Sequence, residues 1–330
     1  MAYVLDSGIR TTHEDFEGRA QWGTTTADNS PDEDDNGHGT LVAGVLGGMT
    51  FGVAKYAELT AVKVLDANGA CTSDGVVAGV VWADKDATAR ALRAQSEKKL
   101  SGYSAHKGSV INMSFGGEGH NQAITDSVRK AIEHGHTVVV AAGNDNEDAC
   151  NSSPSDIGET ITVGATAMDD TLVEDSNWGS CVDIFAPGFK IRSTYFRSDT
   201  SVATASGTSM SAPYVAGVAA YLLSIYPHPT FNPQSKGYDT LLVAYSFAHG
   251  LLPTYASRVL PNPSVFRPKS SSVTIGQNLT PAKIKSAILD MATWGKIDNP
   301  KQSNNAVLFN NVTGSDNMIV WSGEGSWATF

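Results

Sequence analysis

Short runs of continuous apolar, β-branched residues alternate with helical patterns up to about residue 225, and this alternation constrains the fold most strongly. A strand that is apolar throughout needs cover on both faces, and strands separated by helices pair in parallel. We therefore predict an α/β fold, a three-layer sandwich whose mostly parallel central sheet is flanked by helices. The predicted strands are Ala2–Asp6, Leu59–Leu65, Val110–Ser114, Thr137–Ala142, Thr160–Gly164 and Val182–Phe185.

The helical patterns predict four helices in the same region, which are His38–Leu46, Asp74–Leu100, Gln122–His134 and Ser209–Ile225. The pattern then changes, because eight prolines lie between residues 227 and 281. We interpret 227–279 as a surface insertion with one short helix near Tyr238–His249. Helical order resumes after Thr280, a predicted N-cap followed by Pro281, and the stretch NAVLFNNV predicts a closing strand. The expected organisation is a single domain over 1–330, with a core of 1–226 and 280–314 and a tail of 315–330.

The overall charge and composition exclude several classes of protein. A formal net charge of −11 argues against nucleic acid as a partner. No run of 18 apolar residues is present, so we expect no membrane span. The eight histidines include no H-E-x-x-H motif, which argues against a metal-dependent hydrolase.

Four polar residues follow predicted strands or precede a small-residue helix. Asp6 ends the first strand, His38 lies between glycines, Asn144 follows a strand and a glycine, and Ser209 precedes an apolar helix. Each alone is ordinary as a turn, cap or core residue. Together they supply a nucleophile, a base and an orienting acid in the order Asp, His, Ser, which is a recognised order of the catalytic triad. An esterase of the α/β-hydrolase type needs G-x-S-x-G and another order, and Ser209 has neither.

The local sequences around these residues are DSG, GHGTLVAG, AAGN and GTSMSAP. They resemble the four signatures of the subtilases, the subtilisin-like serine proteases, and most closely the secreted fungal type of the proteinase K branch. The resemblance implies that Ser209 is the nucleophile, His38 the base and acid, and Asp6 the residue that orients His38. It also implies that Asn144 donates a hydrogen bond into the oxyanion hole.

The resemblance further implies where a peptide substrate binds. One stretch would pair with the substrate backbone, and a second, of small residues, would line the pocket for the residue before the cut. The first stretch is Ser114, Phe115 and Gly116, and the second is Ala141, Ala142 and Gly143. We expect a serine endopeptidase of broad specificity with an apolar or aromatic preference. The alternative is an inactive protein of the same fold that only binds its partners.

Two structural features are also implied by the resemblance. Cys150 and Cys181 would form a disulfide, with two buried free thiols as the alternative. A calcium ion would bind the backbone carbonyls of Gly158 and Thr160 and the carboxylate of Asp183, unless Asp183 only caps or pairs within its loop. The acidic run at 31–37 opens like an EF-hand but lacks the closing glutamate, and we interpret it as a solvated loop before His38.

Subtilases carry a signal peptide and a removable propeptide before the mature domain, and MAYVLDSGIR resembles neither. We therefore expect low activity or poor folding when the chain is made without a propeptide. The implied partners are protein or peptide substrates and the protein's own propeptide. We expect a secreted monomer that needs no cofactor for catalysis and holds at most a structural calcium.

Overall fold

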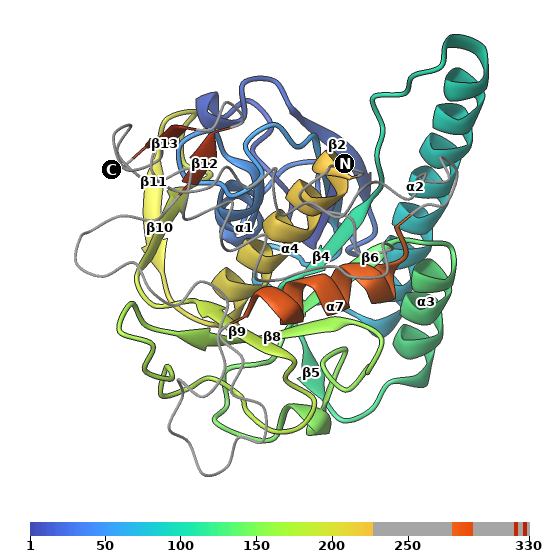
Figure 1. Ribbon diagram of the computed structural model, residues 1–330. Coiled ribbons are helices and arrows are strands. Elements are labelled where there is room, and N and C mark those ends of the chain that lie inside the picture. Colours follow the sequence, from blue (N-terminus) through green and yellow to red (C-terminus); the bar gives the residue numbers. More distant parts are fainter. Residues whose placement is uncertain (227–278, 293–319, 323–325, 329–330) are drawn as a thin grey trace, which may run out of the picture.

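A parallel sheet of seven strands forms the centre of the molecule (Figure 1). The computed structural model describes residues 1–226, 279–292, 320–322 and 326–328. The strands lie in the order β2-β3-β1-β4-β6-β8-β9, and every pairing in this sheet is parallel. Their bounds are β1 Ala2–Asp6, β2 Ala20–Thr25, β3 Leu59–Lys63, β4 Val110–Met113, β6 Thr137–Ala141, β8 Ile161–Thr166 and β9 Ile184–Pro187.

Helices cover both faces of this sheet, as Figure 1 shows. On one face lie α1 (His38–Gly47), α4 (Thr208–Ile225) and α7 (Pro281–Met291). On the other lie α2 (Ser73–Ser101) and α3 (Gln122–Glu133). The three-layer α/β prediction is therefore confirmed.

The alternation of side chains along each strand explains the two cores. In β1, Ala2 and Val4 pack into the core beneath α1 and α4, while Tyr3 and Leu5 pack into the core beneath α2 and α3. All four are fully buried. A strand placed between two helical layers has no polar face, and this is why its sequence is an unbroken apolar run.

The remaining elements are short. Within the described residues, three antiparallel pairs and two 3-10 helices lie outside the central sheet. They are β5 Gly117–Glu118 with β7 Ser152–Ser153, β10 Ile191–Thr194 with β11 Val202–Ala205, β12 Val320–Ser322 with β13 Ser326–Ala328, and the 3-10 helices η1 Glu14–Phe16 and η2 Ala149–Asn151.

The six predicted strands are all present, with ends that differ by two residues at most, and the four predicted helices differ by one. Thr280 caps α7 and Pro281 begins it, as predicted. Strand β2 was not predicted, because AQWGTT is a partly exposed edge strand with little apolar pattern. The predicted helix at 238–249 and the predicted strand at 305–312 lie outside the described residues.

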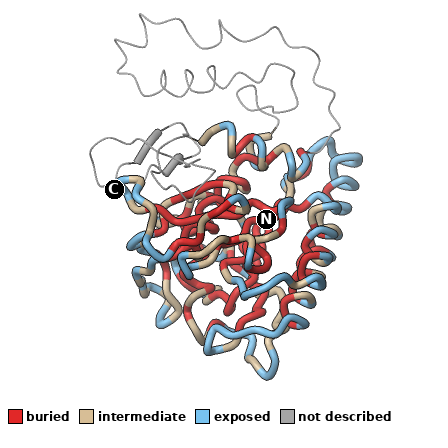
Figure 2. Tube along the Cα trace, turned by 90° about the horizontal axis from the view of Figure 1, so that it is seen from below, coloured by how far each residue is buried: buried red, intermediate tan, exposed pale blue. Residues whose placement is uncertain are grey.

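Helix α4 is the one helix of the described residues that has the length and apolar composition of a membrane span. It lies within the core instead, where it packs against α1 and several strands. The buried residues of the chain gather at the centre of the molecule, as Figure 2 shows. Thirteen of its residues are buried, including Met210, Val215 and Leu222. Its apolar composition is therefore accounted for by its place in the core.

A disulfide joins Cys150 to Cys181, so the predicted pairing is confirmed. The bond closes a loop of 31 residues between η2 and the approach to β9. Closing a loop of that length restricts the unfolded chain and corresponds to about 3–4 kcal/mol of stability in the chain-entropy model.

Removal of this bond tests that value. We expect the Cys150→Ser, Cys181→Ser double variant to lose about 3 kcal/mol in the free energy of unfolding, measured by denaturant titration. Cys71 is exposed and free, so Cys71→Ser is the matched control and should change stability little. Equal stability of the double variant and the control would contradict the prediction.

Candidate active site

The register between β1 and β4 fixes the starting point of the site. Leu5 lies opposite Met113, so the residues that follow, Asp6 and Ser114, lie at adjoining strand ends. Neighbouring strands are about 4.8 Å apart. Ligand sites of open parallel sheets lie beyond this edge. Asp6 also continues the alternation of Ala2 and Val4, which directs its side chain toward the α1 and α4 layer.

His38 is the first residue of α1 and its imidazole meets Asp6. The Nδ1 atom lies 2.8 Å from Asp6 Oδ1, and Asp6 also accepts from the backbone N–H of Ser7 at 2.8 Å. Asp6 is fully buried, whereas the His38 side chain is 32% exposed. The contact needs a glycine at 39, because a Cβ there would lie 2.1 Å from the Gly8 carbonyl oxygen. Gly39 therefore permits α1 to approach the turn after β1 closely.

The pKa of His38 is raised above its ordinary 6.5. Burial opposes this shift because desolvation disfavours the imidazolium, but the charge and hydrogen bond of Asp6 and the charge of Asp34 outweigh it. Protonated His38 therefore adds stability that is fully present below pH 6.5. This stability is lost as the pH rises through the folded-state pKa.

Asp34 holds the loop before His38 in place and was missed by the sequence analysis. Its Oδ1 accepts from Ser7 Oγ at 2.8 Å and from the backbone N–H of Gly37 at 2.8 Å. Its Oδ2 accepts from the backbone N–H of Thr40 at 2.9 Å and from the Thr40 hydroxyl. Asp34 is buried, so the interpretation of the acidic run as a solvated loop is wrong at this position.

The next carboxylate of the run is also engaged. Asp35 lies 2.6 Å from Nζ of Lys63, whose fully buried side chain also donates to the Ser7 carbonyl at 2.7 Å. The only sign of this ion pair in the sequence was a lysine within the otherwise largely apolar strand β3.

Ser209 lies in the first turn of α4, one residue inside the helix. Gly207 is the N-cap and has a φ of 134°, a conformation that favours glycine, so Ser209 is not itself the cap. Its hydroxyl donates to the Ser114 carbonyl at 3.0 Å. Within the described residues no hydrogen bond joins Ser209 to His38. The two pairs, Asp6 with His38 and Ser209 with Ser114, thus meet at adjoining ends of β1 and β4.

Asn144 is oriented by the residue beside the serine. Its Oδ1 accepts from the backbone N–H of Thr208 at 2.8 Å and from the Thr208 hydroxyl at 3.1 Å. The same hydroxyl accepts from the backbone N–H of Gly143 at 3.2 Å. Because its Oδ1 faces Thr208, the amide N–H₂ group of Asn144 points away from Thr208 and can donate to another acceptor. Thr208 is a positioning residue that the sequence analysis did not single out, and the only sequence signal was its place beside Ser209.

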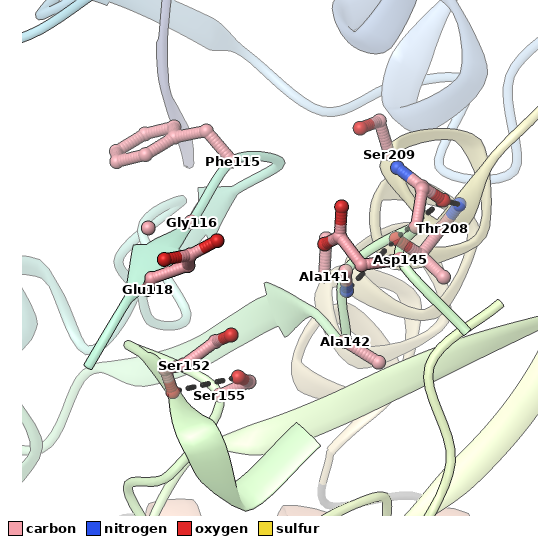
Figure 3. A pocket seen from close by; sticks show the side chains of 13 residues that line it. Phe115, Gly116, Glu118, Ala141, Ala142, Asp145, Ser152, Ser155, Thr208 and Ser209 are labelled. Carbon is pink, nitrogen blue, oxygen red and sulfur yellow. Dashed lines mark hydrogen bonds between the residues drawn. The ribbon is translucent and has the colours of Figure 1, made fainter. Parts of the chain in front are cut away.

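A pocket lies beside these residues, and Figure 3 shows its walls. Of the six predicted substrate residues, five line it, whereas Ser114 contributes the carbonyl bound by Ser209. Two exposed carboxylates, Glu118 and Asp145, also line it and were not anticipated. The lining residues are Phe115, Gly116, Gly117, Glu118, Ala141, Ala142, Gly143, Asn144, Asp145, Ser152, Ser155, Thr208 and Ser209.

The three predicted calcium ligands converge, but on an ammonium group of the chain. Lys285 Nζ lies 2.9 Å from the Gly158 carbonyl oxygen, 2.6 Å from the Thr160 carbonyl oxygen and 2.7 Å from Asp183 Oδ1. Burial raises the pKa of Asp183, against the opposing effect of Lys285 and the backbone N–H of Thr162. No cluster of three or more His, Cys, Asp or Glu side chains suited to a metal occurs in the part of the chain that the structure describes.

Neutralising Asp6 tests the electrostatics of this pair. In Asp6→Asn the burial of His38 remains while its main partner charge is gone, so its pKa should fall below 6.5. Stability should then decrease as the pH falls below 6.5, opposite to the native dependence. NMR titration of the His38 ring, assigned with His38→Gln, measures the pKa. Asp32→Asn, an exposed carboxylate of the same loop, is the control. An unchanged His38 pKa in Asp6→Asn would refute the assignment.

Comparison with known proteins agrees with this geometry. The model of the subtilase family matches residues 3–246. The chain is 49% identical over 226 residues to the subtilisin-like proteinase Spm1 of Pyricularia oryzae, covering 68% of this chain and 41% of that protein. It is 47% identical over 240 residues to cerevisin of Saccharomyces cerevisiae (73% and 36%). It is 39% identical over 326 residues to alkaline protease 2 of Aspergillus fumigatus (98% and 54%).

The chain thus spans about half, or less, of the length of these curated relatives. Among solved structures, a cold adapted subtilisin-like serine proteinase superposes with a TM-score of 0.68 at 34% identity, covering 93% of this chain and 87% of that one. The fold of this chain is therefore shared with a known subtilisin-like proteinase. The chain belongs to the subtilase family.

Proposed function

We propose that the chain is a serine endopeptidase that cleaves peptide bonds through an Asp6–His38–Ser209 triad. The observation that carries this proposal is that the Asp6–His38 pair and the Ser209–Ser114 hydrogen bond lie at adjoining ends of β1 and β4, and that Ser209 lines the pocket there. The names of the relatives, which include proteinases and an alkaline protease, support the same reaction. The presence of all three triad residues in the chain argues against the alternative, an inactive binding protein of the same fold.

In the proposed reaction the Ser209 Oγ attacks the carbonyl carbon of the scissile bond and its proton passes to Nε2 of His38. Asp6 keeps the Nδ1–H directed toward itself and stabilises the imidazolium. The oxygen that becomes negative accepts hydrogen bonds from the Asn144 amide and the Ser209 backbone N–H. The C–N bond then breaks as His38 returns the proton to the leaving amine. Water repeats the sequence on the acyl-enzyme, and no cofactor takes part.

Binding of a peptide substrate would release the Ser209 hydroxyl from its hydrogen bond to the Ser114 carbonyl. Ser114, Phe115 and Gly116 follow β4 and offer an edge to which an extended peptide can add. A peptide N–H that donates to the Ser114 carbonyl would compete with the Ser209 hydroxyl for this acceptor. The released hydroxyl can then turn about its Cα–Cβ bond toward His38, because catalytic hydrogen bonds often form fully only with substrate present.

The pocket supports an apolar or aromatic preference for the residue before the cut. Ala141, Ala142 and Gly143 leave space for a large side chain, and Ala141 and Ala142 are buried. Glu118 and Asp145 are exposed and add negative charge to the same pocket. We therefore propose broad specificity in which acidic side chains are disfavoured.

The proposed setting is extracellular. The Cys150–Cys181 disulfide is typical of proteins that fold in an oxidising compartment. The proposed partners are protein substrates and a propeptide that assists folding, and the proposed state is a monomer. Propeptide supplied in trans should raise the yield of active enzyme if this part of the proposal holds.

Removal of the nucleophile tests the reaction. We expect Ser209→Ala to abolish labelling by a fluorophosphonate probe and to lower casein hydrolysis by at least about 10³-fold. Ser224→Ala, on the exposed end of the same helix, should retain both. Labelling that persists in Ser209→Ala would show that another residue is the nucleophile. A natively folded chain that is neither labelled nor active with propeptide present would favour the binding protein.

The oxyanion donor and its positioning residue are tested by two further variants. Asn144→Ala should lower kcat by about 10²–10³-fold with little change in KM, the magnitude typical of a subtilisin donor of this kind. Thr208→Val removes the hydroxyl that orients Asn144 and should lower kcat less, by about 10-fold. Thr208→Ser keeps the hydroxyl and is the control. A Thr208→Val enzyme with native kcat would show that the backbone N–H of Thr208 is sufficient to hold Asn144.

A further inference from the structure

The ammonium group of Lys285 joins three segments that are far apart in the sequence. Lys285 lies on α7, Gly158 and Thr160 lie in the loop before β8, and Asp183 lies directly before β9. The side chains of the ion pair are only 18% and 19% exposed. Such a pair is shielded from water much more than the surface pairs of this chain, for example Arg129 with Glu159.

The number of donors matches the number of acceptors. An ammonium group carries three N–H donors and no acceptor, and the structure gives Lys285 three oxygen partners at 2.6–2.9 Å. Asp183 also accepts from the backbone N–H of Thr162 through Oδ2 at 2.9 Å. The lysine is therefore an integral part of the loop arrangement.

These three oxygens are the ones that the family resemblance assigns to a calcium ion, and the arrangement does not fit one. Calcium takes six to eight oxygens at about 2.3–2.6 Å. Here the position from which the three oxygens could be reached is taken by Nζ of Lys285. A divalent cation placed beside the ammonium would be repelled by it, so the two are mutually exclusive.

We propose that Lys285 is a built-in cation that replaces calcium at this site and fastens α7 to the loop before β8. This proposal does not depend on peptidase activity. It predicts a covalently attached cation that chelators cannot remove. It also predicts that the site becomes a calcium site only when the lysine side chain is removed.

The loop before β8, which Lys285 binds, is also connected to a wall of the pocket. Thr162 lies two residues after Thr160, in β8, and its hydroxyl donates to the Ser155 carbonyl at 3.2 Å. Ser155 lines the pocket, and its own hydroxyl donates to the Ala149 carbonyl at 2.7 Å. Loss of the Lys285 contacts should therefore loosen this wall as well as the attachment of α7.

Thermal unfolding of matched variants tests the proposal. All are made in a Ser209→Ala background, so that self-digestion does not obscure the transition. In EDTA we expect Lys285→Ala to lower Tm by about 5 °C, because it leaves the partly buried carboxylate of Asp183 without its counter-charge and two carbonyls without their ammonium donor. Lys283→Ala, two residues earlier on the same helix, is the control for the change in charge and should lower Tm by about 1 °C or less.

Calcium then distinguishes a cation site from a simple ion pair. Millimolar CaCl₂ should restore most of the lost Tm in Lys285→Ala, and the response should exceed that of the parent chain and of Lys283→Ala. Lys285→Met fills the space with an apolar chain and should lower Tm without the added calcium response. Equal Tm values of Lys285→Ala and Lys283→Ala in EDTA would overturn the proposed role, and equal calcium responses would overturn the equivalence with calcium.

The parent chain gives a test that does not depend on the folding of any variant at position 285. In crystals soaked in CaCl₂, Lys285 Nζ should remain within hydrogen-bond distance of Asp183 and both carbonyls. A calcium ion bound to Asp183, with the lysine displaced, would overturn the proposal.

Discussion

The parallel alignment of β1 with β4 is the constraint on which the rest of the site depends. It brings the carboxyl ends of both strands to one edge, and the side-chain alternation of β1 directs Asp6 toward the helical layer that contains α1 and α4. Both helices begin at this edge, one with His38 and the other with Thr208 and Ser209. A shift of β1 by one residue would direct Asp6 toward the α2 layer and separate it from His38, even if every helix kept its place.

Buried polar side chains then determine the exact positions of the reactive groups. Asp34 binds the chain after β1 through Ser7 and the start of α1 through Thr40, so the Asp6–His38 contact is held from both sides. Thr208 does the same for Asn144 and the start of α4. Each network includes a bond from a backbone N–H group at a helix start to a side chain, and such N–H groups have no partner within the helix. Helix starts that would otherwise need capping thereby become the supports of the site.

The fold could be predicted from the sequence because its information is local. Continuous apolar runs such as residues 138–141 and the helix signals around Thr280 can each be recognised within a few residues. The edge strand β2 escaped prediction because partial exposure leaves no such run. Asp34 and Lys285 escaped for a different reason. Their partners lie far away in the sequence or in backbone atoms, and a carboxylate or lysine whose partners are unknown has the sequence pattern of a solvated residue.

The features of the site also fall into those that a local sequence motif reveals and those that depend on contacts between distant segments. Asp6, His38, Asn144 and Ser209 lie within short motifs, so a resemblance in sequence sufficed to single them out. The direction of the Ser209 hydroxyl toward the Ser114 carbonyl depends on how α4 sits against β4, and no local pattern contains that information. The same holds for the two carboxylates of the pocket, Glu118 and Asp145, which reach it from different strand ends.

Three lysines share one physical role in these loops. Lys63 donates to the Ser7 carbonyl, Lys55 to the carbonyls of Met49 and Thr50, and Lys285 to two carbonyls before β8. Irregular loops cannot satisfy their backbone carbonyls through a regular ladder, and burial makes an unsatisfied carbonyl costly. An ammonium group with three donors satisfies several at once, and where it is most buried a carboxylate neutralises it, Asp35 for Lys63 and Asp183 for Lys285. A calcium ion satisfies carbonyl oxygens in the same way, and for this reason the ammonium group of Lys285 can take the place proposed for calcium at this position.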